Sequence, residues 1–307
     1  MDLSVVICVR NGRSVIGKQL DALAVQKTSI DWEVVVADNG STDSTREYCE
    51  QRSKSFPVPL RVVDAGKQPS IPIARNVGAQ HAAGSVIAYC DSDDEVVAGW
   101  VQAAWNSINK GFDIVAGQCI ERSDSLFAHG KVLNPGCLIG QETGNLAVMA
   151  GNFAVKKKIF IEVGGFDEGL PPYGCEEFDF SIRLKNLGAE FGAAPDMVIL
   201  FQPTHNKKKL IKKIYRSAMA EHVLWHRHPE RFSDELRPHY LMKRFIRWPV
   251  DSACLVYQKR SRALNPILRS LVNLCGHMDA EVRWVRLGKL KPGKYLQDKR
   301  DNVDSLQ

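Results

Sequence analysis

Apolar residues in the first part of the chain alternate between two patterns. Leu3–Val9 and Glu33–Ala37 are nearly continuous apolar runs, which is typical of strands buried on both faces of a sheet. Between such runs, apolar residues recur at helical spacing. The predicted strands are 3–9, 33–37, 60–63 and 85–90, and the predicted helices are 14–25, 44–52 and 73–83. This alternation predicts an α/β fold with a mixed, mostly parallel sheet flanked by helices.

The pattern changes after about residue 206. Segments 207–228, 239–248 and 264–275 have helical spacing and many basic residues. Residues 1–205 carry a net charge of −7, whereas residues 206–307 carry +13. We therefore predict an α/β domain over 1–205 and a basic, mostly helical C-terminal extension over 206–307.

Composition excludes several classes of protein. No apolar run approaches the roughly 20 residues that cross a bilayer. The first strand begins without a basic segment before it, so a cleaved export signal is not expected. No two of the eight cysteines are at CxxC spacing, which leaves a disulfide framework or cysteine zinc site without support. We expect a cytoplasmic protein with reduced thiols.

Acidic residues follow two of the predicted strands. Asp38 ends the second strand, and Asp91-Ser92-Asp93-Asp94 follows the fourth. Ligands of such sheets bind at the carboxyl ends of the strands. Crowded carboxylates repel one another unless a cation joins them, and Mg²⁺ or Mn²⁺ with phosphate oxygens fits this need. The alternative is that both clusters form solvated turns or helix caps.

Two further groups suggest chemistry. Arg75 opens a predicted helix and could meet a phosphate, although a surface ion pair is the alternative. Glu176, Glu177 and Asp179 follow a glycine-rich turn and begin an amphipathic helix. Acidic residues there could simply complement the helix dipole. They could also supply a general base aimed at an incoming hydroxyl.

Taken together, these motifs resemble the family-2 glycosyltransferases of the GT-A fold, a Rossmann-like architecture. The resemblance covers about residues 3–205, which would then form the nucleotide-sugar-binding and catalytic domain. Each motif is modest alone, and their order along the chain makes the set specific. The matching segments are Val5–Asn11, Val36–Asp43, Ala74–Gly78, Asp91–Asp94, Ala150–Val155, Gly164–Asp167 and Glu176–Asp179.

The resemblance implies a role for individual residues. Glu177 takes the place of the catalytic base. Donor and nucleotide contacts are expected from Val9, Arg10, Asn11, Asp38, Arg75, Asp91, Ser92 and Asp93. The acceptor side is expected to include Gly151, Asn152 and Glu176. The metal, Mn²⁺ or Mg²⁺, is expected at Asp93, Asp91 and His205.

The implied reaction is inverting, metal-assisted transfer of a sugar from a nucleoside-diphosphate sugar to an acceptor hydroxyl, lipid-linked or on a glycan. This activity belongs to polysaccharide or glycoconjugate biosynthesis. One departure from the family is that Glu176-Glu177 stands where Glu-Asp is usual.

Two other functions and two roles for the extension stay open. A nucleotidyltransferase would need a basic, glycine-rich loop after the first strand, and Arg10-Asn11-Gly12-Arg13 is short for one. A non-catalytic sugar-nucleotide-binding or scaffold protein would be expected to lose the carboxylates. The basic extension 206–307 either contacts the inner face of a membrane peripherally or packs on the catalytic domain. No nucleic acid is expected, because no recognised binding motif is present.

Overall fold

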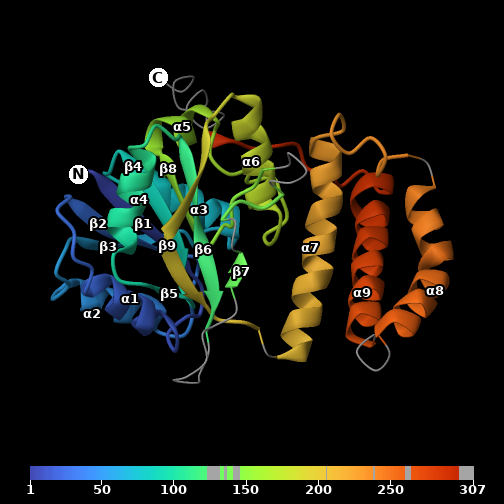
Figure 1. Cartoon of the computed structure of the whole chain (residues 1–307), viewed down its shortest axis with the longest axis horizontal. Coiled ribbons are helices and arrows are strands. Elements are labelled where there is room, and N and C mark those ends of the chain that lie inside the picture. The colour runs from blue at the N-terminus through green and yellow to red at the C-terminus, as the bar shows by residue number, and fades with distance from the viewer. Residues whose placement is uncertain are drawn as a thin grey trace. The chain divides into compact units, whose positions relative to one another are not determined.

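The structure, a computed structural model, describes residues 1–122, 132–134, 137–140, 146–204, 206–237, 239–259 and 264–296. Two compact units divide this chain (Figure 1). The first unit contains Met1–Glu168, Glu176–Pro203 and, from the C-terminal part, Tyr295 and Leu296. The second contains Gly169–Cys175 and Thr204–Lys294. The predicted domain limits, 1–205 and 206–307, stay a prediction.

The described strands of the first unit form one sheet with the order β3-β2-β1-β4-β8-β6-β9-β5, and β7 pairs with β6. They are β1 (Leu3–Val9), β2 (Trp32–Asp38), β3 (Leu60–Asp64), β4 (Val86–Asp91), β5 (Glu95–Val96), β6 (Ile114–Glu121), β7 (Val132–Asn134), β8 (Asn152–Lys156) and β9 (Phe191–Phe201). Neighbours among β3, β2, β1 and β4 are parallel, and β8 is antiparallel to both β4 and β6. The predicted α/β class with a mixed sheet is confirmed.

Helices cover both faces of this sheet, which explains the unbroken apolar runs. Leu3, Val5 and Ile7 of β1 join one core cluster, whereas Val6 joins the other, as expected for side chains that alternate along a strand. The first cluster includes side chains from α1 (Ile16–Ala24), α2 (Thr45–Ser53) and α4 (Trp100–Ile108). The second includes side chains from α3 (Ile71–His81), α5 (Lys157–Glu162) and α6 (Glu176–Asn186).

An aromatic cluster packs the segment before α6 against that helix. Phe166 stacks on Phe180 of α6 with 4.7 Å between ring centroids, and Tyr89 stacks on Phe153 at the same spacing. Asn76 pins the backbone of Phe166 on both sides: its Oδ1 accepts from the Phe166 amide at 2.8 Å, and its Nδ2 donates to the Phe166 carbonyl at 2.9 Å. The Ala74–Gly78 and Gly164–Asp167 motifs therefore meet in space.

The second unit is helical. Its long helices are α7 (Lys207–Arg227), α8 (Tyr240–Lys259) and α9 (Leu264–Ala280), and α9 runs into a π-helical turn, η3 (Glu281–Arg286). α7 and α9 approach closely at Gly276, where a β-carbon would lie 2.7 Å from the Tyr215 carbonyl oxygen. All three predicted helices are confirmed, and α8 continues past Pro249. Within the described ranges, no helix has the length and apolar character needed to span a membrane.

Candidate active site

The carboxyl ends of three parallel strands bring two distant aspartates to one edge of the sheet. Val9 at the end of β1 is in register with Asp38 of β2, and Cys8 is in register with Asp91 of β4. Asp38 and Asp91 therefore flank the end of β1 on its two sides. Placement at this edge is what a ligand site in such a sheet requires.

The loops after β1 and β2 are tied together by Asn11. Asn11 has a left-handed backbone (φ +52°), and its Oδ1 accepts from the Thr42 amide at 2.8 Å. Its own amide donates to Ser41 Oγ at 3.0 Å. Both carboxylate oxygens of Asp38 accept from the Ser41 amide at 3.3 Å, and Asp38 is buried. The turn-forming role that the sequence left open for Asp38 is thus present in the structure.

Val9 and Arg10, also expected at the nucleotide, differ in their exposure to solvent. Val9 is buried in the core below the loop, and Arg10 is exposed. The amide of Gly12 donates to Thr45 Oγ1 at 3.0 Å, which holds this short loop against the start of α2. Val9 can therefore shape the floor of a pocket, whereas Arg10 is accessible to a ligand.

The buried side chain of Arg75 contacts carboxylates from two other motifs. Arg75 of α3 pairs through Nη1 with the Glu176 carboxylate, and its Nη2 lies 3.4 Å from Asp91 Oδ1. A buried guanidinium is tolerated because these carboxylates compensate its lost hydration. The alternative of a surface ion pair for Arg75 is wrong, because its side chain is only 5% exposed. Glu176 is paired with Arg75, and its expected place on the acceptor side stays a prediction.

The other carboxylates of this helical turn differ in their surroundings. Asp179 is fully buried and receives hydrogen bonds from Nε and Nη2 of Arg183 at 2.9 and 2.7 Å. Glu177 is half-buried, and no described cationic group lies within salt-bridge distance of it. Burial and the neighbouring charge of Glu176 raise the pKa of Glu177 to about 8. Glu177 is thus the carboxylate of this turn that is suited to exchange a proton.

The acidic run after β4 contains both accessible and structural members. Asp91 and Ser92 are half-buried and Asp93 is exposed. Asp94 is buried, and its Oδ1 accepts from the Gln202 amide at 3.0 Å. Asp91 and Asp93 can therefore offer carboxylate oxygens to a cation, and oxygen ligands suit Mg²⁺ and Mn²⁺. The third expected ligand, His205, lies outside the described residues.

Gly151 and Asn152, two of the three residues predicted on the acceptor side, have different surroundings. Gly151 faces Asp91: a β-carbon at this position would lie 2.7 Å from Asp91 Oδ2, so a side chain here would crowd that carboxylate. Asn152 is fully buried, and its amide is engaged in the core. It accepts from Trp100 Nε1 and donates to the carbonyl oxygens of Gln118 and Met197, each at 2.9 Å. Its side chain links four elements beneath the site.

Sequence reasoning missed the residues that hold the site in place. Besides its pairing with Asp179, Arg183 donates to the carbonyl oxygens of Val163 and Gly165, both at 2.7 Å. Asn76 was noted beside Arg75, but its contact with Phe166 was not predicted. The Arg183–Asp179 spacing of four residues in a helix was an available signal.

Comparison with known proteins agrees with this geometry. The model of the family described as Glycosyl transferase family 2 matches residues 4–166, more than half of the chain. A relative from Bacillus subtilis, the uncharacterized glycosyltransferase YfnE, is 25% identical over 268 residues, which cover 70% of this chain and 68% of the relative.

Two solved structures share the fold. The mannosyltransferase PcManGT from Pyrobaculum calidifontis, in complex with GDP-Man and Mn²⁺, aligns with a TM-score of 0.57 and 17% identity over 99% of this chain and 79% of the other. Residues 1–349 of TarS from S. aureus, in complex with UDP-GlcNAc, align with a TM-score of 0.57 and 15% identity over 94% and 92%. The ordered motifs, the sheet-edge carboxylates and the family match agree: the chain belongs to glycosyl transferase family 2 and has the GT-A fold.

Proposed function

We propose that this glycosyltransferase transfers a sugar from a nucleoside-diphosphate sugar to an acceptor hydroxyl with inversion at the anomeric carbon, assisted by Mn²⁺ or Mg²⁺. One observation carries the proposal. Of three carboxylates in the first turn of α6, Glu176 and Asp179 are paired with arginines, whereas Glu177 forms no salt bridge with a described residue and has a raised pKa. A carboxylate with this pKa is matched to general-base catalysis near neutral pH.

The donor is expected at the edge formed by β1, β2 and β4. Asp38 and Asn11 border it on one side and Asp91 on the other. PcManGT and TarS were solved with a guanine and a uracil nucleotide sugar respectively, so the family match supports the donor class without choosing a base. Asp91 and Asp93 would hold the cation, which when bound supplies positive charge to the diphosphate leaving group.

The residues of this chain then have distinct tasks in a single displacement. Glu177 accepts the proton of the acceptor hydroxyl as that oxygen bonds to the anomeric carbon. The bond between the anomeric carbon and the diphosphate oxygen breaks, and its electron pair leaves with the nucleoside diphosphate. Arg75 keeps Glu176 and Asp91 in place around this centre. No covalent intermediate with the protein is required.

The rival functions are less well supported. A nucleotidyltransferase would hold a triphosphate with the loop after β1, yet the Gly12 amide there is already bonded to Thr45 Oγ1. A non-catalytic scaffold would have no need of a half-buried carboxylate beside the metal-binding acids.

A panel of nucleotide sugars tests the proposal. The melting temperature is measured for each candidate with Mn²⁺, with Mg²⁺ and with a chelator. A ligand that binds only the native state raises the melting temperature, by about 2.7 kcal/mol of added stability at 100 times its Kd. We expect metal-dependent stabilisation by at least one nucleoside-diphosphate sugar. Stabilisation by nucleoside triphosphates alone, or by none of the panel, would contradict the proposal.

The second unit is proposed to contact an anionic membrane peripherally. α8 exposes the apolar side chains of Met242, Phe245, Ile246 and Val250. Met242, Ile246 and Val250 are four residues apart and Phe245 is three from Met242, so they lie along one stripe of the helix. Lys243 and Arg247 are exposed on the same helix. An exposed apolar stripe beside basic residues is the arrangement by which helices lie on anionic bilayers.

A further inference from the structure

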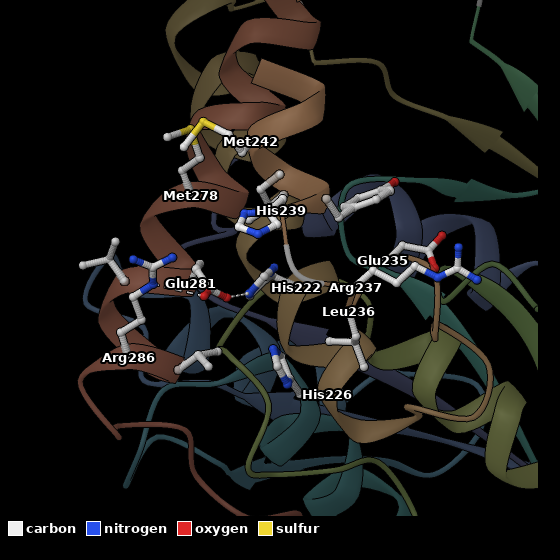
Figure 2. Close-up of a pocket in the computed structure, with 14 residues that line it drawn as sticks. His222, His226, Glu235, Leu236, Arg237, His239, Met242, Met278, Glu281 and Arg286 are labelled. Carbon is white, nitrogen blue, oxygen red and sulfur yellow. Dashed lines mark hydrogen bonds and ion pairs between the residues drawn. The ribbon is translucent and has the colours of Figure 1, made fainter. Parts of the chain in front are cut away.

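A cavity of about 530 Å³ lies within the second unit, apart from the sheet edge described above (Figure 2). Its lining comes from α7, residues 235–237 and 239–242, the end of α9 and η3. Three of the lining residues carry side chains that commonly bind metal ions, namely His222, His226 and Glu281. None of them takes part in the proposed sugar transfer.

These three side chains converge on one point. His222 and His226 lie one helical turn apart on α7, so their rings share a face of the helix. Glu281 is the first residue of η3. One ligand atom from each residue lies within 4.8 Å of those of the other two. Figure 2 shows the imidazole of His222 directed at Glu281, and His222 Nε2 is 3.1 Å from Glu281 Oε2.

The cluster contains buried nitrogen atoms that lack a partner. His222 is only 2% exposed. Its Nδ1 and the Nε2 of His226 are buried without a hydrogen-bond partner in the described part of the chain. Buried polar atoms are nearly always satisfied, because leaving one unsatisfied costs roughly 1–3 kcal/mol. Unsatisfied ring nitrogens on two residues of this cluster point to a ligand that accepts a lone pair.

A neighbouring arginine supports the carboxylate of the cluster. Glu281 is oriented by Arg286, whose Nε lies 3.2 Å from the second carboxylate oxygen. Support of this kind for a ligating carboxylate is typical of metal sites.

We propose that His222, His226 and Glu281 form a binding site for a divalent transition-metal ion, with Zn²⁺ the best match. Two imidazole nitrogens and one carboxylate oxygen are a usual ligand set for Zn²⁺, whereas Mg²⁺ and Ca²⁺ prefer oxygen ligands alone. Because the three ligands line the cavity, the remaining coordination position is accessible to water or a small ligand. The ion would clamp the C-terminal half of α7 to η3.

This site differs from the proposed catalytic metal site in chemistry. Asp91 and Asp93 offer oxygen ligands only, and their ion is expected to bind together with the nucleotide. The histidine cluster is expected to bind its ion without nucleotide. Ion preference and nucleotide dependence therefore separate the two sites experimentally.

The test uses the full chain, stripped of metal with a chelator and titrated calorimetrically with Zn²⁺ in the absence of nucleotide. We expect one equivalent to bind to the wild type and to Asp93→Asn. In His226→Gln the contact between His222 and Glu281 is retained, so a purely structural pair would be unaffected. Loss of a metal ligand should weaken Zn²⁺ binding by more than the roughly 10–100-fold typical of residues behind the ligands.

His239→Gln is the matched control, because His239 lines the same cavity but lies outside the cluster. Its affinity for Zn²⁺ should equal that of the wild type. The proposal is overturned if the wild type binds no Zn²⁺, if His226→Gln binds as tightly as the wild type, or if Asp93→Asn or His239→Gln abolishes binding. Should His226→Gln not fold, Co²⁺ absorption of the wild type decides: intense visible bands of a four- or five-coordinate ion support the site, and the weak bands of an octahedral ion reject it.

Discussion

At the scale of single residues, the first turn of α6 holds three carboxylates with different tasks. Glu177→Gln keeps the size of the side chain but cannot accept a proton. Because a general base typically contributes about 10²–10⁴-fold to the rate, we expect turnover to fall by that factor. Nucleotide affinity should change little, since the proposed role of Glu177 is toward the acceptor and not the nucleotide. Steady-state turnover and nucleotide binding, measured separately, check this.

Glu176→Gln and Asp179→Asn are the controls for that substitution. Each removes the charge of a buried carboxylate that is paired with an arginine, and breaking a buried pair costs about 3–5 kcal/mol. We therefore expect lower melting temperatures with chemistry largely retained in the molecules that fold. Near-normal turnover in Glu177→Gln would remove its assignment as the base, and a folded but inactive Asp179→Asn would shift the assignment to that residue.

The raised pKa of Glu177 predicts the direction of the pH dependence. A base works only when deprotonated, and burial with the neighbouring Glu176 charge makes this carboxyl hold its proton to higher pH than usual. The value of kcat/KM should therefore rise with pH along an acidic limb whose midpoint lies above 4.5, the ordinary value, and at or below about 8. In Glu177→Gln the residual rate should lack that limb. A pH–rate profile without such a limb in the wild type would contradict the prediction.

Asp93→Asn removes one charge and little volume from the acidic run after β4. Nucleotide affinity in this variant should lose its dependence on Mn²⁺ or Mg²⁺, because Asp93 is the exposed carboxylate of the run. Asp94→Asn is the control, since Asp94 is buried, its Oδ1 accepts from the Gln202 amide, and an asparagine can preserve that bond. Titrations with and without metal distinguish the two. A full metal-dependent gain in Asp93→Asn would show that the ion lies elsewhere.

Much of the candidate site could be predicted from the sequence, but its internal pairing could not. Asp38 and Asp91 were predictable at one edge because each follows a buried strand. The Arg75–Glu176 pair joins residues 101 positions apart, and no local pattern records such a contact. The enclosure of Asn152 depends on Trp100, Gln118 and Met197 from other elements in the same way.

At the scale of elements, α8 is the part of the second unit whose surface predicts a partner. We expect the protein to sediment with anionic vesicles more than with neutral ones, because each Lys or Arg near an anionic surface contributes about 1 kcal/mol. The double substitution Phe245→Ser, Ile246→Ser should reduce this binding by removing exposed apolar area. Leu187→Ser, an exposed apolar site in the first unit, is the control. Equal sedimentation with both vesicles, or none, would reject the membrane role.

Element prediction succeeded where burial imposes a simple pattern. β1 was predicted at its observed bounds because a strand covered on both faces needs an apolar residue at nearly every position. β9 contains Gly192, Pro195 and Asp196 within its span, so its full length carries no strand pattern. α8 extends beyond the predicted segment because the helix continues through Pro249, a residue that usually interrupts one.

At the scale of the whole molecule, the change of composition near residue 205 has a counterpart in the division between units after Pro203. What composition could not indicate is that Gly169–Cys175 is grouped with the helices and Tyr295 with the sheet. These assignments rest on contacts between residues distant in sequence. The Cys175 thiol approaches the Ser217 carbonyl oxygen at 3.8 Å, and the Arg183 guanidinium lies 4.7 Å from the centre of the Tyr295 ring.

The return of the chain to the first unit at Tyr295 has a consequence for the order of folding. The Leu296 amide donates to the Gly164 carbonyl at 2.9 Å, and the Leu296 side chain is part of the core beside Gly165. During synthesis, the strands of the first unit therefore emerge from the ribosome before this piece of their core. Until Leu296 is made, Gly164 and Gly165 lack this neighbour, so the core around them is completed only after the helices of the second unit have been synthesised.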